Sequence, residues 1–226
     1  MVGEKLYKLN EMFETIQGEG VYTGVPSVFI RLQKCSVGCA WCDTKQTWYV
    51  NPEDEQPIEK ILVKSVDEPT WCSVTAQQLV SLYLERYSAK HIVITGGEPC
   101  EYDLLPLTQA FEEIGCQCQI ETSGTSEIKV TDATWVTVSP KINMKGKLPI
   151  LPSALQRANE IKHPVGSNKD IEQLEALLSG QTTKSDVVVS LQPISQKARA
   201  TQLCIKTCIK RNWRLSIQTH KYLDIA

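Results

Sequence analysis

Three cysteines, Cys35, Cys39 and Cys42, lie within eight positions of this 226-residue chain. A tetrahedral zinc site needs four ligands, and the nearest histidine, His91, lies far downstream. Protein-bound iron–sulfur clusters normally use four thiolates, so three would leave one iron open to a ligand that is not protein. The spacing therefore favours an iron–sulfur cluster whose open iron is a place for chemistry.

The same three cysteines also have the i, i+4, i+7 spacing of one helix face, and free cysteine is among the most buried residue types. Three core cysteines on a helix are therefore the alternative. Gly38 lies inside the segment, however, and the preceding SVFIRL, residues 27–32, has the composition of a strand. These features favour a loop that follows a strand.

The elements that must position this loop follow from hydrophobic periodicity and turn residues. Near the N-terminus, MFETI (12–16) and SVFIRL predict two strands joined by the loop QGEG, residues 17–20. Further helices are expected over residues 74–87, 103–115, from about 153, 169–180 and 197–212, with Pro106 in a first turn. Further strands are expected over residues 91–95, 117–124, 133–141, 160–166, 186–193 and 213–223.

Five of these apolar strands end in polar or turn-forming residues: TGGE (95–98), ETSG (121–124), SPK (139–141), QPIS (192–195) and QTHK (218–221). Strands that alternate with helices pair in parallel through right-handed crossovers. In α/β barrels the C-terminal ends of the strands build the functional site. We therefore expect an α/β fold, a partial (β/α) barrel of mostly parallel strands, with the five endings on one face beside the cysteines.

Composition suits one globular domain over residues 1–226, with 42% hydrophobic residues. Lysine plus arginine (24) nearly balances aspartate plus glutamate (26), which argues against direct nucleic-acid binding. The N-terminus has no apolar signal core, and no stretch approaches eighteen apolar residues, so we expect a cytoplasmic protein without a membrane span. In that reducing compartment nine cysteines indicate metal binding or inert thiols rather than disulfides.

Residues 45–73 interrupt the pattern with prolines 52 and 57 and an acidic stretch, and we expect an excursion from the core. A solvated connection is favoured over a docking surface that uses Trp48, Tyr49 and Trp71. Four further cysteines are expected in the core: Cys116, Cys118, Cys204 and Cys208.

Arg31 lies on the strand face opposite Val28, Ile30 and Leu32. It is either solvated or, if that face lines a barrel interior, in need of a carboxylate that a substrate could supply. Cys100 follows GGEP and is expected near the site, but its position does not imply reactivity.

The CxxxCxxC spacing, with Trp41 before the last cysteine, resembles the signature of radical S-adenosylmethionine (SAM) enzymes. Within that superfamily FETIQGEG (13–20), TGVPSVFIRL (23–32) and CDT (42–44) resemble the 7-carboxy-7-deazaguanine synthases of the queuosine-precursor pathway, which leads to modified tRNA. The resemblance runs from about Asn10 to Ala226.

The resemblance implies a lyase that converts 6-carboxy-5,6,7,8-tetrahydropterin to 7-carboxy-7-deazaguanine. It implies reductive cleavage of SAM to a 5′-deoxyadenosyl radical, hydrogen abstraction, ring contraction with loss of ammonia, and return of the hydrogen so that SAM is regenerated. The implied cofactors are a 4Fe-4S cluster, SAM and Mg²⁺. A flavodoxin-like reductant and a homodimer are the implied partners.

The resemblance also implies roles for individual residues. Cys35, Cys39 and Cys42 would hold the cluster, and Thr44 would meet the magnesium ion. The residues implied to hold SAM are Trp41, Cys42, Asp43, Gly97, Glu98, Ser139, Pro140, Lys141, Gln192, Pro193, Ile194 and Ser195. The residues implied to hold the substrate are Ile16, Gln17, Gly18, Glu19, Arg31, Thr95, His220 and Ala226.

The types of these residues suit the roles. Backbone carbonyls near Gly97 can take the ammonium of SAM, and Glu98 can help or brace the loop. Ser139 and Lys141 can meet hydroxyls or a carboxylate. Glu19 can accept paired N–H donors of a pterin, and the guanidinium of Arg31 matches its carboxylate.

Two other functions are weighed against this one. A glycyl-radical-enzyme activase would use the same cluster motif on a protein loop, but QGEG, Arg31 and CDT argue against it. A non-catalytic electron carrier or structural metal module would need no SAM pocket, so the five polar strand ends argue against it.

Overall fold

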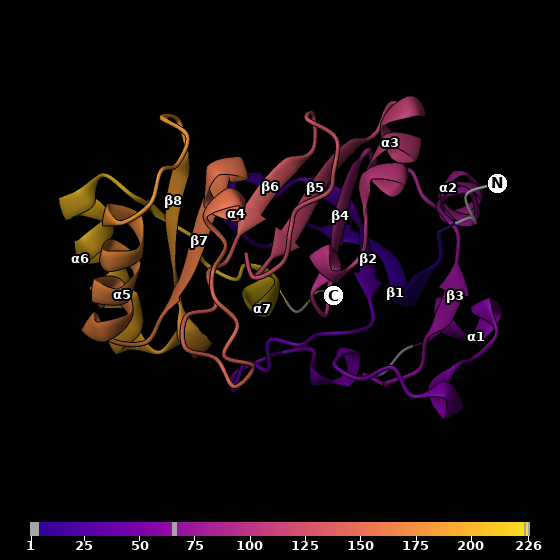
Figure 1. Cartoon of the computed structure of the whole chain (residues 1–226), viewed down its shortest axis with the longest axis horizontal. Helices are drawn as coiled ribbons and strands as arrows, with labels where there is room; N and C mark the ends of the chain where they lie inside the picture. Colours follow the sequence, from indigo (N-terminus) through magenta and orange to yellow (C-terminus); the bar gives the residue numbers. More distant parts are fainter. Residues whose placement is uncertain (1–4, 65–66, 224, 226) are drawn as a thin grey trace.

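One sheet of nine strands, in the order β3-β1-β2-β4-β5-β6-β7-β8-β9, runs through the computed structural model, which describes residues 5–64, 67–223 and 225 (Figure 1). The two outer strands, β3 and β9, do not pair with each other, so the sheet stays open. This arrangement confirms the predicted partial barrel.

The N-terminal part of the sheet is antiparallel. Strand β1 (Tyr7–Ile16) pairs with β2 (Pro26–Leu32), and the short edge strand β3 (Cys72–Val74) pairs with the other side of β1. Between β1 and β2 the QGEG loop leads into a 3₁₀ turn, η1 (Gly20–Tyr22). The predicted order of strand, loop and strand is confirmed.

From β2 onward every pairing is parallel. The strands are β4 (His91–Gly96), β5 (Gln117–Thr122), β6 (Trp135–Val138), β7 (Glu160–Val165), β8 (Val188–Pro193) and β9 (Arg214–Leu215). Because parallel strands run the same way, their carboxyl ends meet at one edge of the sheet.

The crossovers between these strands are the helices α2 (Ala76–Arg86), α3 (Leu105–Glu113), α4 (Pro152–Arg157), α5 (Asn168–Ser179) and α6 (Ala198–Arg211). Helix α2 begins at a capping box of Thr75 and Gln78, and Pro106 lies in the first turn of α3 as predicted. Figure 1 shows α5 and α6 side by side along β7 and β8. Within the described residues no helix has the length and apolar character needed to cross a membrane.

The core lies between the helices and the sheet. Val28, Ile30 and Leu32 of β2 are fully buried in it, which matches their predicted common face. The core also contains the cysteines that were expected there: Cys116, Cys118, Cys204 and Cys208.

The last predicted strand, residues 213–223, is wrong over most of its length. Only Arg214–Leu215 pairs with β8, and the chain then leaves the sheet and forms the short helix α7 (His220–Leu223). The backbone N–H of Thr219 donates instead to the carbonyl of Gly18 at 2.9 Å, an ordinary hydrogen-bond distance. The segment therefore turns toward the QGEG loop.

Residues 45–71 form short turns, η2 (Lys45–Thr47) and η3 (Pro52–Asp54), and helix α1 (Ile58–Leu62). Two fully buried amides tie this segment to the sheet. Asn10 donates to the carbonyls of Glu68 and Thr70, and Gln33 donates to those of Gln46 and Tyr49 at 2.7–2.8 Å. The segment is thus bound to the fold by its backbone, and a docking role for it stays a prediction.

The end of β4 fixes the start of the cysteine loop. The N–H groups of Gly97 and Glu98 donate to the carbonyls of Leu32 and Lys34, both at 2.8 Å, so pairing continues past the last residues of β2 and β4. A Cβ atom at position 97 would lie 2.0 Å from the carbonyl oxygen of Lys34, so only glycine allows this approach.

We expect Gly97→Ala to lower the free energy of unfolding by about 1–3 kcal/mol, because the added methyl group must push two backbones apart. Urea unfolding of the cluster-free protein measures this. Gly180→Ala is the matched control, since its Cβ would meet nothing closer than 3.6 Å. Equal stability of the two variants would contradict the expected backbone contact.

Candidate functional site

A cavity of about 250 Å³ opens at the carboxyl ends of the parallel strands, beside the cysteine loop. All five polar strand endings predicted from the sequence contribute to its wall, and so does β7. The lining residues are Glu19, Cys35, Val37, Cys39, Trp41, Cys42, Asp43, Thr44, Trp48, Thr95, Gly96, Gly97, Glu98, Glu121, Thr122, Ser123, Ser139, Lys141, Lys162, Pro164, Gln192, Pro193, Ile194, Ser195, Gln218 and Lys221.

The three cysteines lie on a loop without helix, so the alternative of a helix with three core cysteines is wrong. All three line the cavity, and no fourth cysteine does so among the residues that the structure describes. Burial raises the pKa of Cys35 to about 11 and also raises the pKa of Cys39. These thiols are therefore protonated in the chain alone and would be ionised by iron, as thiol ligands are.

The sulfur of Cys42 already accepts hydrogen bonds. The N–H of Thr44 and the indole Nε1 of Trp48 each lie 3.4 Å from its Sγ. Donors of this kind tune iron–sulfur clusters by stabilising charge on the ligand sulfur. The cavity thus supplies three thiols on one loop and donors around one of them, which fits a cluster held by three protein ligands.

Within the described residues, no group of three His, Cys, Asp or Glu side chains stands close enough together to be a metal site as it is. The three thiols share a cavity without converging on one point. Thr44, implied as the magnesium contact, lies among them, with Oγ1 3.7 Å from Sγ of Cys42 and 3.5 Å from the carbonyl of Gly96.

Glu98 braces the loops around the cavity. This carboxylate is buried, and it accepts hydrogen bonds from the N–H of Cys100, the hydroxyl of Thr122 and the N–H of Ser123 at 2.6–3.0 Å. Its four lone-pair positions are therefore largely used within the protein. Of the two roles considered for Glu98, bracing the loop is the one that the structure supports.

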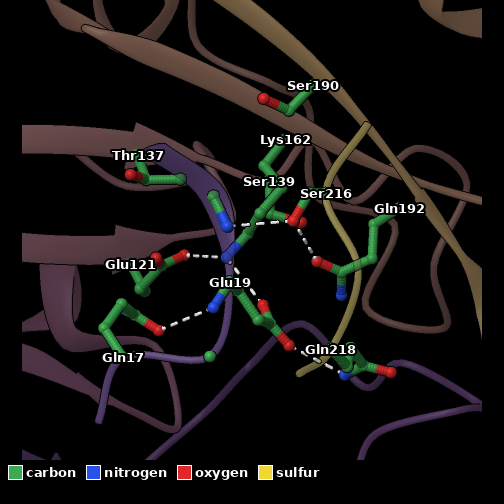
Figure 2. A network of polar contacts seen from close by, with 12 residues as sticks. Gln17, Glu19, Glu121, Thr137, Ser139, Lys162, Ser190, Gln192, Ser216 and Gln218 are labelled. Atoms are coloured by element: carbon green, nitrogen blue, oxygen red, sulfur yellow. Dashed lines mark hydrogen bonds and ion pairs between the residues drawn. The ribbon is translucent and has the colours of Figure 1, made fainter. Parts of the chain in front are cut away.

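A buried cluster of one lysine and two carboxylates also lines the cavity. Lys162, from β7, lies 2.7 Å from Oε2 of Glu19 and 2.9 Å from Oε2 of Glu121 (Figure 2). Gln218 donates to the other oxygen of Glu19 at 2.8 Å. The N–H of Glu19 donates to Oε1 of Gln17 at 3.1 Å, so the whole residue is held in place.

These neighbours give the carboxyl groups of Glu19 and Glu121 different pKa values. Burial alone would raise the pKa of Glu19, but the ammonium of Lys162 and the hydrogen bond from Gln218 outweigh it and lower that pKa to about 2. Burial, together with the charge of Glu19, raises the pKa of Glu121 to about 7 against the opposing effect of Lys162. Burial likewise opposes the charge of Lys162, but Glu121 and Glu19 outweigh it and raise its pKa.

The QGEG loop is held from both sides. Glu160 of β7, fully buried, accepts from the N–H of Val21 at 3.2 Å. From the C-terminal segment, the hydroxyl of Ser216 accepts from the N–H of Gly20 at 2.9 Å. A Cβ atom at Gly18 would lie 2.4 Å from Nδ1 of His220, so glycine allows this close packing of loop and helix α7.

Most of the residues implied by the resemblance line the cavity, as given above. Six of the described ones are not part of the lining: Ile16, Gln17, Gly18, Arg31, Pro140 and His220. Ala226, the last, lies outside the described residues, so its role stays a prediction.

Arg31 also lies outside the lining. It is next to Thr95 in register, one strand away from the cavity, but its guanidinium pairs with Glu11 and lies over the ring of Phe13, 5.8 Å from the centroid. The protein itself supplies a carboxylate of the kind that a substrate could have supplied. A direct role for Arg31 in substrate binding stays a prediction.

Sequence reasoning missed Lys162 and Glu160; it placed Glu121 and Gln218 within two of the polar strand endings but gave neither of them a role. Glu160 and Lys162 alternate along β7, EIKHPV, which places both on one face of the strand. Two charged residues at alternate positions of a central strand were the available signal, because such charges are buried only with partners.

No family model matches the chain. A 7-carboxy-7-deazaguanine synthase of Escherichia coli K12 is 58% identical over 221 residues, which cover 97% of this chain and 99% of the relative. A protein of the same name from Buchnera aphidicola is 50% identical over 220 residues, with 97% and 99% coverage. The crystal structure of QueE from Escherichia coli superposes with a TM-score of 0.92 at 56% identity and covers 94% of both chains.

The chain belongs to the 7-carboxy-7-deazaguanine synthase family. It is therefore an enzyme, and the family resemblance drawn from FETIQGEG, TGVPSVFIRL and CDT is confirmed. The likeness extends over nearly the whole length, so it includes the QGEG loop, the cysteine loop and the strand ends. For this member of the 7-carboxy-7-deazaguanine synthase family, the two rival functions are not supported.

The raised pKa of Glu121 predicts how stability depends on pH. Because this pKa is about 7 in the folded chain and near 4.5 in the unfolded one, the folded state gains from Glu121 below pH 4.5 and loses that gain as the pH rises through 7. We expect the free energy of unfolding of the wild type to fall between pH 5 and about 7.5 because of Glu121, and we expect this contribution to be absent from Glu121→Gln.

Urea unfolding of the cluster-free protein at a series of pH values measures it, and the informative quantity is the difference between wild type and variant. The three histidines, His91, His163 and His220, have lowered pKa values, so they act in the opposite direction in both proteins and cancel in that difference. A pH-independent difference would show that Glu121 does not titrate in this range.

Proposed function

We propose that this chain catalyses the radical conversion of 6-carboxy-5,6,7,8-tetrahydropterin to 7-carboxy-7-deazaguanine, with a 4Fe-4S cluster, SAM and Mg²⁺ as cofactors. The observation that carries the proposal is that one cavity is lined both by three thiols from a single loop and by a carboxylate, Glu19, that lies 2.7 Å from the ammonium of a buried lysine. Family membership supports the same reaction.

In the half of the cavity lined by the thiols, Cys35, Cys39 and Cys42 would hold the cluster. When bound, the cluster and SAM supply the one-electron chemistry that starts the reaction. The chain's part is to position them. Trp41 and the strand ends after β4, β6 and β8 surround this half and offer carbonyls, hydroxyls and the ammonium of Lys141, whose Nζ donates to Ser139 at 2.6 Å.

In the other half, Glu19 is the acceptor for a pterin. Its two oxygens each accept one hydrogen bond from the protein, and a carboxylate oxygen can accept another, so both remain open to neighbouring N–H donors of the substrate. Thr95, at the end of β4, lines the same cavity and can meet the pterin edge. Thr219 binds the carbonyl of Gly18 through its N–H and its hydroxyl, and Lys162 of β7 binds Glu19, so both segments hold the QGEG loop in place.

Three further assignments belong to this proposal. Thr44 offers a hydroxyl to Mg²⁺, an ion that prefers oxygen ligands and keeps several waters. A flavodoxin-like protein is the proposed electron donor, and a homodimer the proposed assembly. The queuosine-precursor pathway is the proposed context.

One assay tests the function. We expect the anaerobically reconstituted enzyme, with reductant and SAM, to convert the carboxypterin to 7-carboxy-7-deazaguanine with release of ammonia. The control omits the pterin, and the expected result there is 5′-deoxyadenosine at a low, uncoupled rate. Cleavage of SAM that the carboxypterin leaves unchanged, with no deazaguanine formed, would contradict the proposed substrate.

The cluster assignment predicts a second result. Alanine at any of positions 35, 39 or 42 should abolish normal iron loading, because no other cysteine among the described residues lines the cavity to replace the lost thiolate. Iron and sulfide per chain, with the absorbance spectrum, measure it. Cys204→Ala and Cys208→Ala, both on the buried face of α6, should load like wild type, and normal loading of Cys39→Ala would refute the assignment.

A further inference from the structure

Lys162 is a buried cation for which the reaction so far gives no role. Its side chain is 5% exposed, and it projects from β7 into the cavity between two carboxylates, as Figure 2 shows. Burying an ammonium group is unfavourable unless partners compensate for the lost water. An uncharged residue on β7 would avoid that cost, so the lysine needs an explanation in the site itself.

The explanation lies in the charge of Glu19. Burial by itself favours the protonated form of this carboxyl group, and Glu121 beside Lys162 adds a second negative charge. Two carboxylates this close do not both stay ionised without a cation. Lys162 contacts both, and its contact with Oε2 of Glu19 is the shorter, 2.7 Å against 2.9 Å.

Lys162 also fixes where Glu19 points. Lys162 donates to Oε2 of Glu19, Gln218 donates to Oε1, and the backbone N–H of Glu19 donates to Gln17. These contacts fix the plane of the carboxylate before a ligand binds. Lysine is a point charge with three donors, so it can hold Glu19 and Glu121 together without taking every lone pair of either. A fixed, ionised acceptor binds paired N–H donors more strongly than a mobile or protonated one.

We propose that Lys162 is a positioning residue that keeps Glu19 ionised and oriented as the acceptor for the paired N–H donors of a pterin. This inference rests on the proposed function and assigns a residue to it. Lys162 does not itself touch the reacting atoms; it acts through Glu19.

Other charged groups also face Glu19, and the test has to hold them constant. They come from β5, β7, the turn after β6 and α7: Glu121, Glu160, Lys141, His220 and, through Gln218, Lys221. Glu121 is the one that titrates near neutral pH and that shares Lys162. The comparison is therefore made in a chain without its charge.

The experiment compares Glu121→Gln with Glu121→Gln/Lys162→Met. The second change removes one ammonium where the first had removed one carboxylate, so the double variant keeps the net buried charge of the wild type, which limits the loss of stability. The probe is 6-carboxypterin, the oxidised and fluorescent form of the proposed substrate, titrated into the reconstituted enzyme with SAM under anaerobic conditions. Iron per chain and the thermal midpoint of each variant are matched first.

We expect Glu121→Gln/Lys162→Met to bind 6-carboxypterin at least tenfold more weakly than Glu121→Gln at pH 7.5. The gap should widen as the pH falls toward 5.5, because Glu19 without its lysine takes up a proton in this range, whereas with Lys162 it stays ionised. His220 is present in both variants, so its titration does not produce the difference. Lys162→Arg should restore part of the affinity and remove the pH dependence, since the charge returns.

Adding Lys162→Met to Glu19→Gln/Glu121→Gln should change the affinity less than twofold, because the residue through which Lys162 acts is then absent. A gap of less than twofold between the first two variants, or a gap that does not vary with pH, would overturn the positioning role. If wild type and Glu121→Gln both fail to bind 6-carboxypterin, the proposed substrate is overturned instead. The two failures are therefore distinguishable.

Discussion

The backbone pairing of β2 and β4 continues beyond the last residue of either strand, and the position of the cysteine loop depends on it. Two hydrogen bonds, from Gly97 and Glu98 to the carbonyls of Leu32 and Lys34, hold the start of the loop against the end of β4. This is possible because glycine at position 97 lets the two backbones approach. The geometry of the sheet therefore places the start of the cysteine loop at the strand ends.

The open side of the sheet is bridged by two segments that belong to neither edge strand. The QGEG loop follows β1, near one edge, and residues 216–220 follow β9, at the other. Thr219 and Gln218 bind Gly18 and Glu19 across this gap, and the hydroxyl of Ser216 binds the N–H of Gly20. These contacts join the two ends of the open sheet at the level of the cavity. One of the residues that makes them, Glu19, is also the proposed acceptor for substrate.

The sequence predicted the order of the elements because each strand and helix carries its own local pattern. The cavity followed from that order, since the carboxyl ends of parallel strands meet at one edge of the sheet. A local sequence pattern does not indicate which distant residue pairs with a buried charge. Lys162 pairs with Glu19, 143 residues away, and Arg31 pairs with Glu11 on a neighbouring strand. The last strand failed for the same reason: Ser216 still binds β8, but Gln218 and Thr219 bind the QGEG loop.

The two halves of the cavity are coupled through Lys141. Burial lowers the pKa of this lysine, while Cys39, Glu19 and Glu121 favour its charged form and Lys162 disfavours it. Negative charge on either side of the cavity therefore favours the ammonium form of Lys141. That ammonium in turn stabilises negative charge on Glu19 and Glu121. A change of charge on one side of the cavity thus acts on the other side through the electrostatics of this lysine.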